Sequence, residues 1–326
     1  MIDTLIKIGA ALNKNTDAWD QVIDKVEPPK EDKKGNPVTN YILELAFDLD
    51  EAKLIIDRGN LREFKKEYPK EFRLRRTLSA RNNKVYVANR IDKLNMLYLS
   101  LFGNEEEGSG QLQKTMDVQM TEMKEPLFYK VLQTIYSQQS AYFLGLEPLF
   151  SEWNDKIKGK VTSLANVFDK QIINKLVGTG KSENLVFAYV SAKSTELGIS
   201  KFTPLSKVEG YEVFASKRFA ELKKTEKEEK RIPEKLCYAS NTRMSSTGPP
   251  NFEDRKVMTF MFGGKTAINY ASDFTLKNIG KNYQLSNAVG MQMESAARFL
   301  KESNTIKIAG VLHTIVPQVL HNSEFN

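Results

Sequence analysis

Cys237 is the only cysteine in the 326-residue chain. A single cysteine excludes an intrachain disulfide and a zinc site built from thiolates alone, two devices that often hold small subdomains together. We interpret the two histidines, His313 and His321, as ordinary surface or packing residues. The fold must therefore be stabilised by side-chain packing, and the chain is long enough to bury a substantial core.

The stretch from Cys237 to Gln318 has the order of elements of a zinc ribbon without most of its ligands. It runs from Cys237 through the glycine pair Gly263-Gly264 and an amphipathic segment to an apolar run that ends at Pro317. A zinc ribbon needs two Cys-x-x-Cys knuckles whose four thiolates surround the metal. In this order of elements, the stretch resembles the large subunit of the type I-B CRISPR Cascade complex, the Csh family.

The resemblance implies where the two knuckles would stand. The first falls on Cys237 and Ser240, and the second on Ser286 and Val289, so one cysteine of four is retained. We therefore expect neither a bound metal nor another cofactor. The resemblance also implies a helix from Met291 onward and then an apolar strand.

Helical periodicity supports a helix from Met291 to Lys301, with Ser286 as a suitable N-cap. An apolar strand is expected from Ile308 to Pro317. We predict that packing of one side of the helix replaces the missing metal, since each fully buried side chain contributes about 1.5 to 3 kcal/mol. The residues on that side are Val289, Met293, Ala296, Ala297 and Leu300.

Basic residues are concentrated in one segment of the chain. The whole chain carries a net charge of +7, which favours an anionic partner. Between Arg58 and Arg90 there are eleven basic and three acidic residues, so this segment alone carries +8. Arginines in such a cluster can contact successive phosphates. The residues predicted to contact nucleic acid, within a run that lacks acidic residues, are Arg73, Arg75, Arg76, Arg81 and Lys84. A solvated basic face is the alternative interpretation.

A second candidate for nucleic-acid contact lies in the carboxy-terminal region. Gly263-Gly264 permits close approach of the backbone to a ligand, and Lys265 adds charge beside it. An ordinary hairpin turn with solvated lysines is an equally good interpretation. The residues of this set are Arg243, Arg255, Lys265, Lys277, Lys281 and Asn282.

Two features that suggest catalysis are interpreted structurally. Residues 177–182 read Val-Gly-Thr-Gly-Lys-Ser, but Lys175 stands where a phosphate-binding P-loop needs its first glycine, so we predict a loop that joins a helix to a strand. Asp48, Asp50 and Glu51 are close in sequence, as nuclease carboxylates are, yet acidic residues are common in turns. We expect a binding protein and no enzyme.

The pattern of apolar residues predicts an α+β fold with mixed helices, antiparallel hairpins and a degenerate zinc-ribbon-like insertion near the carboxy terminus. We divide the chain into a basic α/β region (1–105), a mainly helical region (111–235) and a region with the ribbon, a helix and a terminal strand (236–326). The predicted strands cover Tyr41–Phe47, Leu54–Ile56, Lys84–Ala88 and Asn184–Val190, the first two as a hairpin. The predicted helices cover Met1–Leu12, Ile91–Phe102 and parts of Leu127–Phe150.

The resemblance implies a non-catalytic large subunit of an RNA-guided DNA surveillance complex in antiviral defence. Such a subunit recognises the short motif that flanks the target (PAM recognition) and helps to open target double-stranded DNA. The implied partners are crRNA, the Cascade backbone and handle-binding subunits, and a helicase-nuclease that is recruited later. No stretch reaches the roughly 18 apolar residues of a membrane span, so we expect a cytoplasmic protein. A scaffold that binds an acidic protein is the alternative function, and an enzyme with an unrecognised site comes third.

Overall fold

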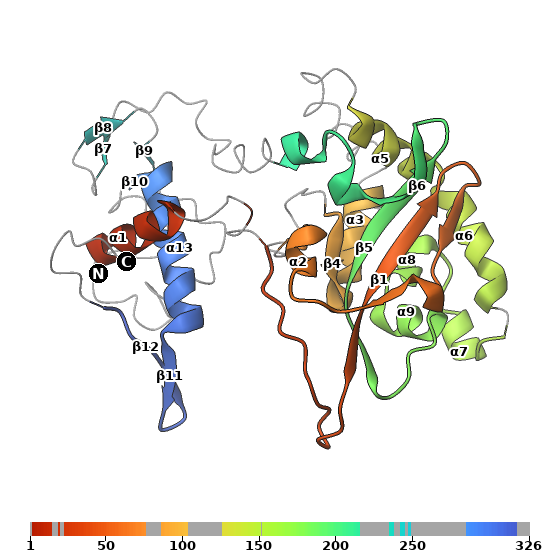
Figure 1. Cartoon of the computed structure of the whole chain (residues 1–326), viewed down its shortest axis with the longest axis horizontal. Coiled ribbons are helices and arrows are strands. Elements are labelled where there is room, and N and C mark those ends of the chain that lie inside the picture. Colours follow the sequence, from red (N-terminus) through yellow and green to blue (C-terminus); the bar gives the residue numbers. More distant parts are fainter. Residues whose placement is uncertain are drawn as a thin grey trace. The chain divides into compact units, whose positions relative to one another are not determined.

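The computed structural model describes residues 2–14, 19, 23–75, 86–103, 126–150, 152–215, 235–237, 242–244, 247–248 and 285–317. The chain forms two compact units, one of residues 22–218 and the other of residues 1–21 with 219–326 (Figure 1). Helices and both mixed and antiparallel sheets are present, so the expected α+β class is confirmed.

The larger unit contains a six-stranded sheet with the order β2-β1-β5-β4, in which β3 also pairs with β1 and β6 with β5. The two central strands run parallel, from Thr39 opposite Glu183 to Asp48 opposite Lys193. The pairs made by the outer strands are antiparallel. The strands are β1 (Thr39–Asp48), β2 (Lys53–Ile55), β3 (Leu61–Glu63), β4 (Ala88–Arg90), β5 (Glu183–Ser194) and β6 (Ile199–Pro204).

Both faces of this sheet are covered, so β1 and β5 are buried along most of their length. On one face, the ring of Phe72 stacks on Tyr189 with their centroids 3.9 Å apart. Side chains alternate between the two faces along a strand, and Phe47 points to the face opposite to that of Tyr189. There it contacts Tyr142 at 4.9 Å and Phe102 at 6.3 Å, each distance measured between ring centroids.

Short helices and 3-10 turns surround the sheet (Figure 1). The α-helices of this unit are α2 (Tyr68–Glu71), α3 (Leu94–Phe102), α5 (Leu127–Ser137), α6 (Gln139–Leu146), α7 (Asp155–Lys158), α8 (Leu164–Val167) and α9 (Lys170–Leu176). Residues 211–215 are also helical. The 3-10 helices are η1 (Arg58–Asn60), η2 (Ile91–Lys93), η4 (Glu147–Phe150) and η5 (Leu205–Lys207). The predicted helices in this part of the chain are therefore confirmed.

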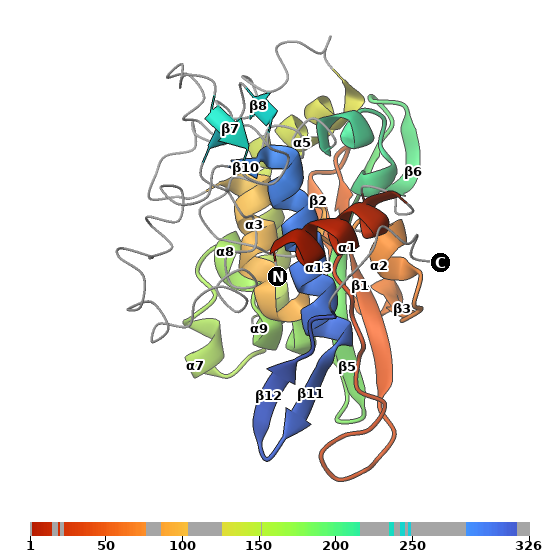
Figure 2. The ribbon, with the colours of Figure 1, turned by 90° about the vertical axis from the view of Figure 1, so that its left-hand side faces the viewer.

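The smaller unit is organised around two helices, α1 (Ile2–Lys14) and α13 (Asn287–Ser303), which lie side by side (Figure 2). Their backbones approach closely at Gly9, because a Cβ atom on Gly9 would lie 1.9 Å from the carbonyl oxygen of Gln292. The small strands are β7 (Lys235–Cys237), β8 (Thr242–Met244), β9 (Thr247–Gly248), β10 (Leu285–Ser286), β11 (Thr305–Ile308) and β12 (Val311–Thr314).

The predicted apolar side of α13 is confirmed, and it packs on the segment around Cys237. One buried cluster joins Cys237 to α13 and to Leu5 and Ile8 of α1. Its α13 members are Val289, Met293, Ala296, Ala297 and Leu300. Side-chain packing thus connects Cys237 to α13. The participation of α1 was not expected from the sequence.

The structure differs from the predicted elements in three places. The strand expected at Lys84–Ala88 is instead β4 (Ala88–Arg90), and residues 84–85 lie outside the described residues. Strands β8 and β9 were not among the predicted strands, and each pairs with another short strand. The single strand expected at Ile308–Pro317 was wrong, because β11 and β12 form an antiparallel hairpin.

The hairpin turn explains that last difference. Its two central residues, Ala309 and Gly310, both have positive φ, at 49° and 83°. Two successive left-handed residues make the tight turn that matches the twist of paired strands. The chain therefore reverses at a point where the apolar pattern continues.

The two compact units divide the chain differently from the three expected regions. Strand β1 lies in the region 1–105 and β5 in the region 111–235, yet they are neighbours in one sheet. Likewise, α1 from the start of the chain belongs to the unit that contains α13.

Candidate nucleic-acid interface

Four arginines of the basic segment form ion pairs with carboxylates from other parts of the chain. Arg58 donates to Glu183, and this contact holds the pKa of Glu183 below its ordinary value. Arg62 donates to Glu44 at 3.0 Å. The other two pairs are Arg73 with Glu212 and Arg90 with Asp24.

These ion pairs offset part of the positive charge counted for residues 58–90 in the sequence. None of the four carboxylates lies between residues 58 and 90, so they were absent from the count of +8. Paired arginines attract a distant polyanion less, because each is accompanied by a negative charge. The segment is therefore less cationic in the fold than its sequence indicates.

Arg75 is buried, with 4% of its surface exposed. Its guanidinium lies over the ring of Tyr86, 5.6 Å from the ring centroid, and Tyr86 is also buried. In this arrangement the side chain of Arg75 does not face the surface where a phosphate would bind. It instead holds together the two ends of the segment 76–85.

Most other predicted contact residues lie outside the described part of the chain. In the first set these are Arg76, Arg81 and Lys84. In the second set, Arg243 is the central residue of β8, and the remaining members lie outside the described residues, namely Arg255, Lys265, Lys277, Lys281 and Asn282. Their predicted role stays a prediction.

Arg73 lines an open cleft of about 540 Å³. The cleft lies between the end of α2 and the stretch that runs from η5 into the helical residues 211–215. Three cationic and three anionic side chains line it. The lining residues are Lys70, Glu71, Arg73, Ser206, Lys207, Val208, Glu209, Gly210 and Glu212.

Lys207 was not among the predicted contact residues, although it faces the same cleft as Arg73. It is 134 positions away in sequence, and a single positive charge in a mixed stretch gives no signal. In the structure its ammonium lies 2.6 Å from the carboxylate of Glu71, another lining residue. Only the tertiary fold brings this lysine beside the basic segment.

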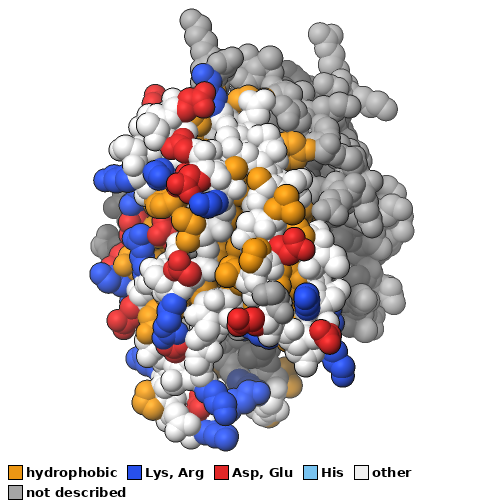
Figure 3. Space-filling view, turned by 90° about the vertical axis from the view of Figure 1, so that its right-hand side faces the viewer, with side chains coloured by type: hydrophobic (Ala, Val, Ile, Leu, Met, Phe, Trp, Pro, Cys, Tyr) orange, Lys and Arg blue, Asp and Glu red, His pale blue; other side chains and the backbone are white. Residues whose placement is uncertain are grey.

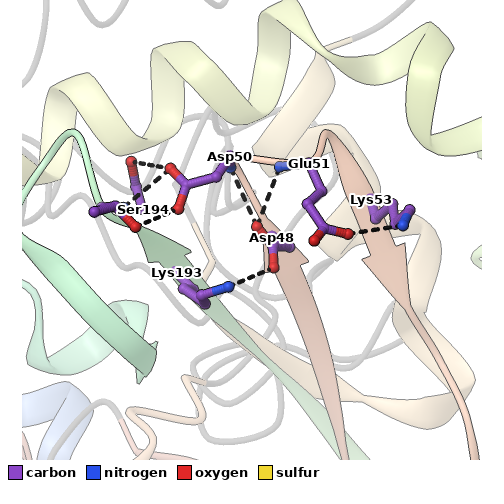
Figure 4. A network of polar contacts seen from close by, with 7 residues as sticks. Asp48, Asp50, Glu51, Lys53, Lys193 and Ser194 are labelled. Carbon is purple, nitrogen blue, oxygen red and sulfur yellow. Dashed lines mark hydrogen bonds and ion pairs between the residues drawn. The ribbon is translucent and has the colours of Figure 1, made fainter.

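Asp48, Asp50 and Glu51 form a structural network at the turn between β1 and β2 (Figure 4). The ammonium of Lys193 on β5 donates to Asp48 at 2.9 Å. The backbone N–H and the hydroxyl of Thr195 donate to Asp50 at 2.8 and 2.7 Å. These carboxylates tie the turn to the end of β5, a distant partner that the sequence did not reveal.

Among the residues that the structure describes, no group of three or more His, Cys, Asp or Glu could hold a metal ion. Cys237 is fully buried in an apolar cluster. Most of residues 238–284, over which the ribbon was predicted, lie outside the described residues, so the ribbon stays a prediction.

The loop with the sequence Val-Gly-Thr-Gly-Lys-Ser joins a helix to a strand, as predicted. It follows α9 and leads into β5 at Glu183. Gly178 has a φ of 62°, and its carbonyl accepts a hydrogen bond from Arg58 at 3.1 Å. The loop therefore has the opposite order from a phosphate-binding P-loop, which follows a strand and opens a helix.

Figure 3 shows one face of the larger unit, with its described residues in colour. On it, the coloured Lys/Arg and Asp/Glu side chains are interspersed, with hydrophobic side chains between them. Such a mixed surface is typical of a solvated face and favours no polyanion. Within the described residues, no helix is long and apolar enough to cross a membrane.

Comparisons of this chain with protein-family models, characterised proteins and solved structures give no match.

Proposed function

We propose that this protein is the non-catalytic large subunit of an RNA-guided DNA surveillance complex of the CRISPR Cascade type. In this role it binds crRNA and target double-stranded DNA beside the backbone and handle-binding subunits. It recognises the short motif that flanks the target and helps to open the duplex. A helicase-nuclease is recruited to the complex later.

One observation supports nucleic-acid binding most directly. The run from Arg73 to Lys84 contains no acidic residue. Arg58, Arg62 and Arg90, which lie outside this run, are paired with carboxylates. The basic residues of this segment with the fewest acidic neighbours in the sequence are therefore Arg76, Arg81 and Lys84. They lie in a segment whose two ends are held by Arg75 and Tyr86.

A protein subunit of such a complex needs few sequence-specific contacts with the target DNA. Base pairing with the guide reads most of the target, and the protein reads only the flanking motif. Arginines and lysines bind duplex phosphates, and a few polar side chains contact base edges in a groove. The carboxy-terminal set from Arg243 to Asn282 supplies further candidates for these contacts.

The first experiment measures binding of the full chain to a labelled DNA duplex over a range of salt concentrations. We expect Arg76→Gln, Arg81→Gln and Lys84→Gln, combined in one variant, to weaken binding. The slope of log K against log salt should fall by about 0.9 for each phosphate contact that is lost. Equal affinity and an equal slope in wild type and variant would contradict this interface.

A matched control removes the same charge elsewhere. Lys30, Lys33 and Lys34 lie on an exposed loop of the same unit, outside both predicted sets. Changing all three to Gln should alter the slope much less. The same assay with crRNA, partner subunits and duplexes of different flanking motifs tests the surveillance role, because that role requires dependence on the flank.

A protein-binding scaffold is the second candidate, and one observation favours it. The hairpin β11–β12 has three exposed aliphatic side chains, and a fourth follows it, where a solvated hairpin normally carries polar residues. They are Ile306, Ile308, Val311 and Ile315. A scaffold predicts no dependence of DNA affinity on the flanking motif.

A further inference from the structure

The cleft beside α2 contains an arginine in a backbone conformation that disfavours it. Arg73 has a φ of 56°. It follows α2 in a Schellman arrangement, in which the N–H of Leu74 bonds to the carbonyl of Pro69 at 2.8 Å and the N–H of Arg73 to that of Lys70 at 3.3 Å. Glycine is strongly favoured at this position, because side chains clash with the backbone when φ is positive.

The arginine side chain is directed into the cleft in spite of this cost. Both Nε and Nη2 of Arg73 donate to the same carboxylate oxygen of Glu212, with Nε at 2.9 Å. Across the cleft, Lys207 donates to Glu71 at 2.6 Å. Two cations from distant parts of the chain therefore face one space, and each is bound to a carboxylate at its rim.

The carboxylate on Arg73 can leave without disturbing the core. The side chain of Glu212 is 48% exposed, and that of Arg73 is 20% exposed. Because Glu212 is the more exposed partner, water can hydrate its carboxylate when it rotates away, and the incoming phosphate supplies the negative charge that the less exposed Arg73 requires. A released Arg73 would still present two N–H groups side by side, the geometry with which guanidinium groups bind phosphate.

We propose that the cleft lined by Lys70, Arg73 and Lys207 is a phosphate-binding subsite, and that the carboxylate of Glu212 binds the guanidinium of Arg73 until a phosphate replaces it. This inference rests on the proposed function, for which the phosphate belongs to the backbone of the bound nucleic acid. The cleft volume of about 540 Å³ is in the range of small-ligand sites, so it accommodates one phosphate with its sugar. The ion pair keeps the site neutral until the nucleic acid arrives.

The test compares two variants that each release one arginine. Glu212→Gln removes the carboxylate from Arg73 in the cleft, whereas Glu183→Gln removes the carboxylate from Arg58 in a pair outside the cleft. Both remove one negative charge that is paired with an arginine. We expect Glu212→Gln to tighten binding of the labelled duplex by roughly threefold to tenfold and to steepen the salt slope by about 0.9, as one added phosphate contact does. Glu183→Gln should change both much less, and equal effects of the two variants would overturn the proposal.

Arg73→Gly separates a binding role from a structural one. Because glycine suits the backbone at this position, the variant should unfold at the same or a higher temperature than wild type. Added to Glu212→Gln, it should abolish the gain in duplex binding. A double variant that keeps the tighter binding would show that Arg73 does not hold the phosphate.

Titration with inorganic pyrophosphate distinguishes failure of this subsite from failure of the proposed function. One outcome supports the subsite and contradicts the nucleic-acid function. In it, wild type binds neither duplex nor crRNA, Glu212→Gln binds pyrophosphate, and adding Arg73→Gly to Glu212→Gln abolishes pyrophosphate binding. If duplex binds to wild type and Glu212→Gln gains neither duplex nor pyrophosphate affinity, the nucleic-acid function stands and the subsite fails.

Discussion

Individual charged residues in this protein have partners that lie far away in sequence. Arg58 pairs with Glu183, and Arg90 pairs with Asp24. Lys193 pairs with Asp48, and Thr195 donates to Asp50. A residue that looks available for ligand binding in the sequence is therefore often used to join two segments of the fold.

Asp50 provides a test of this joining role through its pH dependence. Hydrogen bonds from the backbone N–H and hydroxyl of Thr195 lower the pKa of Asp50 below its ordinary value. Its stabilising contribution is therefore present above the unfolded pKa of about 3.9 and is lost as pH falls through the lower folded pKa. We expect Asp50→Asn to be less stable than wild type at neutral pH and similar to it at pH values below the folded pKa. Urea unfolding across this range measures the difference, and a loss of stability that is the same at every pH would exclude an ionic contribution.

At the scale of elements, the contact of α1 with α13 is set by one glycine. No side chain fits between the helices at Gly9, because its Cβ atom would lie 1.9 Å from the backbone of Gln292. Gly290 of α13 is a contrasting case, since a Cβ atom there would have no neighbour within 4 Å. The two glycines are thus a matched pair for the same substitution.

We expect Gly9→Ala to lower the free energy of unfolding of this unit by about 1 to 3 kcal/mol, the usual cost of overpacking. The helices must separate to admit the methyl group, which would also expose Cys237 in the cluster they share. Denaturant unfolding and the rate of reaction of Cys237 with a thiol reagent measure both effects. Gly290→Ala should leave the thiol protected and stabilise α13 by up to about 1 kcal/mol, because alanine favours a helix. Similar thiol reactivity in the two variants would contradict the close packing at Gly9.

At the scale of the whole molecule, the parallel pairing of β1 and β5 determines which residues fold together. These strands are neighbours along ten residue pairs, although more than 130 residues separate them in sequence. A parallel strand needs a long crossover connection, which here includes most of the larger unit. This unit therefore contains all of residues 22–218.

A fragment of residues 22–218 is expected to fold alone and to unfold cooperatively, whereas a fragment of residues 1–105 is expected not to fold. The shorter fragment contains β1 and β2 but lacks β5, so one edge of β1 and the buried faces of the sheet would be exposed. Circular dichroism during thermal unfolding distinguishes the two. A cooperative transition in the 1–105 fragment would show that the first expected region is an independent domain.

The sequence alone predicted local elements well in this chain. Apolar runs identified β1, β2 and β5, and helical spacing identified α1, α3 and the buried side of α13. These properties depend on residues that are close together in sequence. The period of two residues in a strand and of 3.6 residues in a helix can be recognised within each segment by itself. The local choice between strand and turn was less well predicted at Ala309, where a left-handed pair interrupts an apolar run.

Only the tertiary structure decided which elements meet and which charges remain available. The parallel pairing of β1 with β5, the crossing of α1 and α13 at Gly9, and the convergence of Arg73 and Lys207 on one cleft all join distant segments. Charge counts in a sequence segment omit carboxylates that the fold brings from elsewhere, as it does for Arg58 and Arg90. The physical reason is that periodicity is a property of each segment, whereas ion pairing and close packing depend on the relative positions of segments, which are set only when the whole core forms.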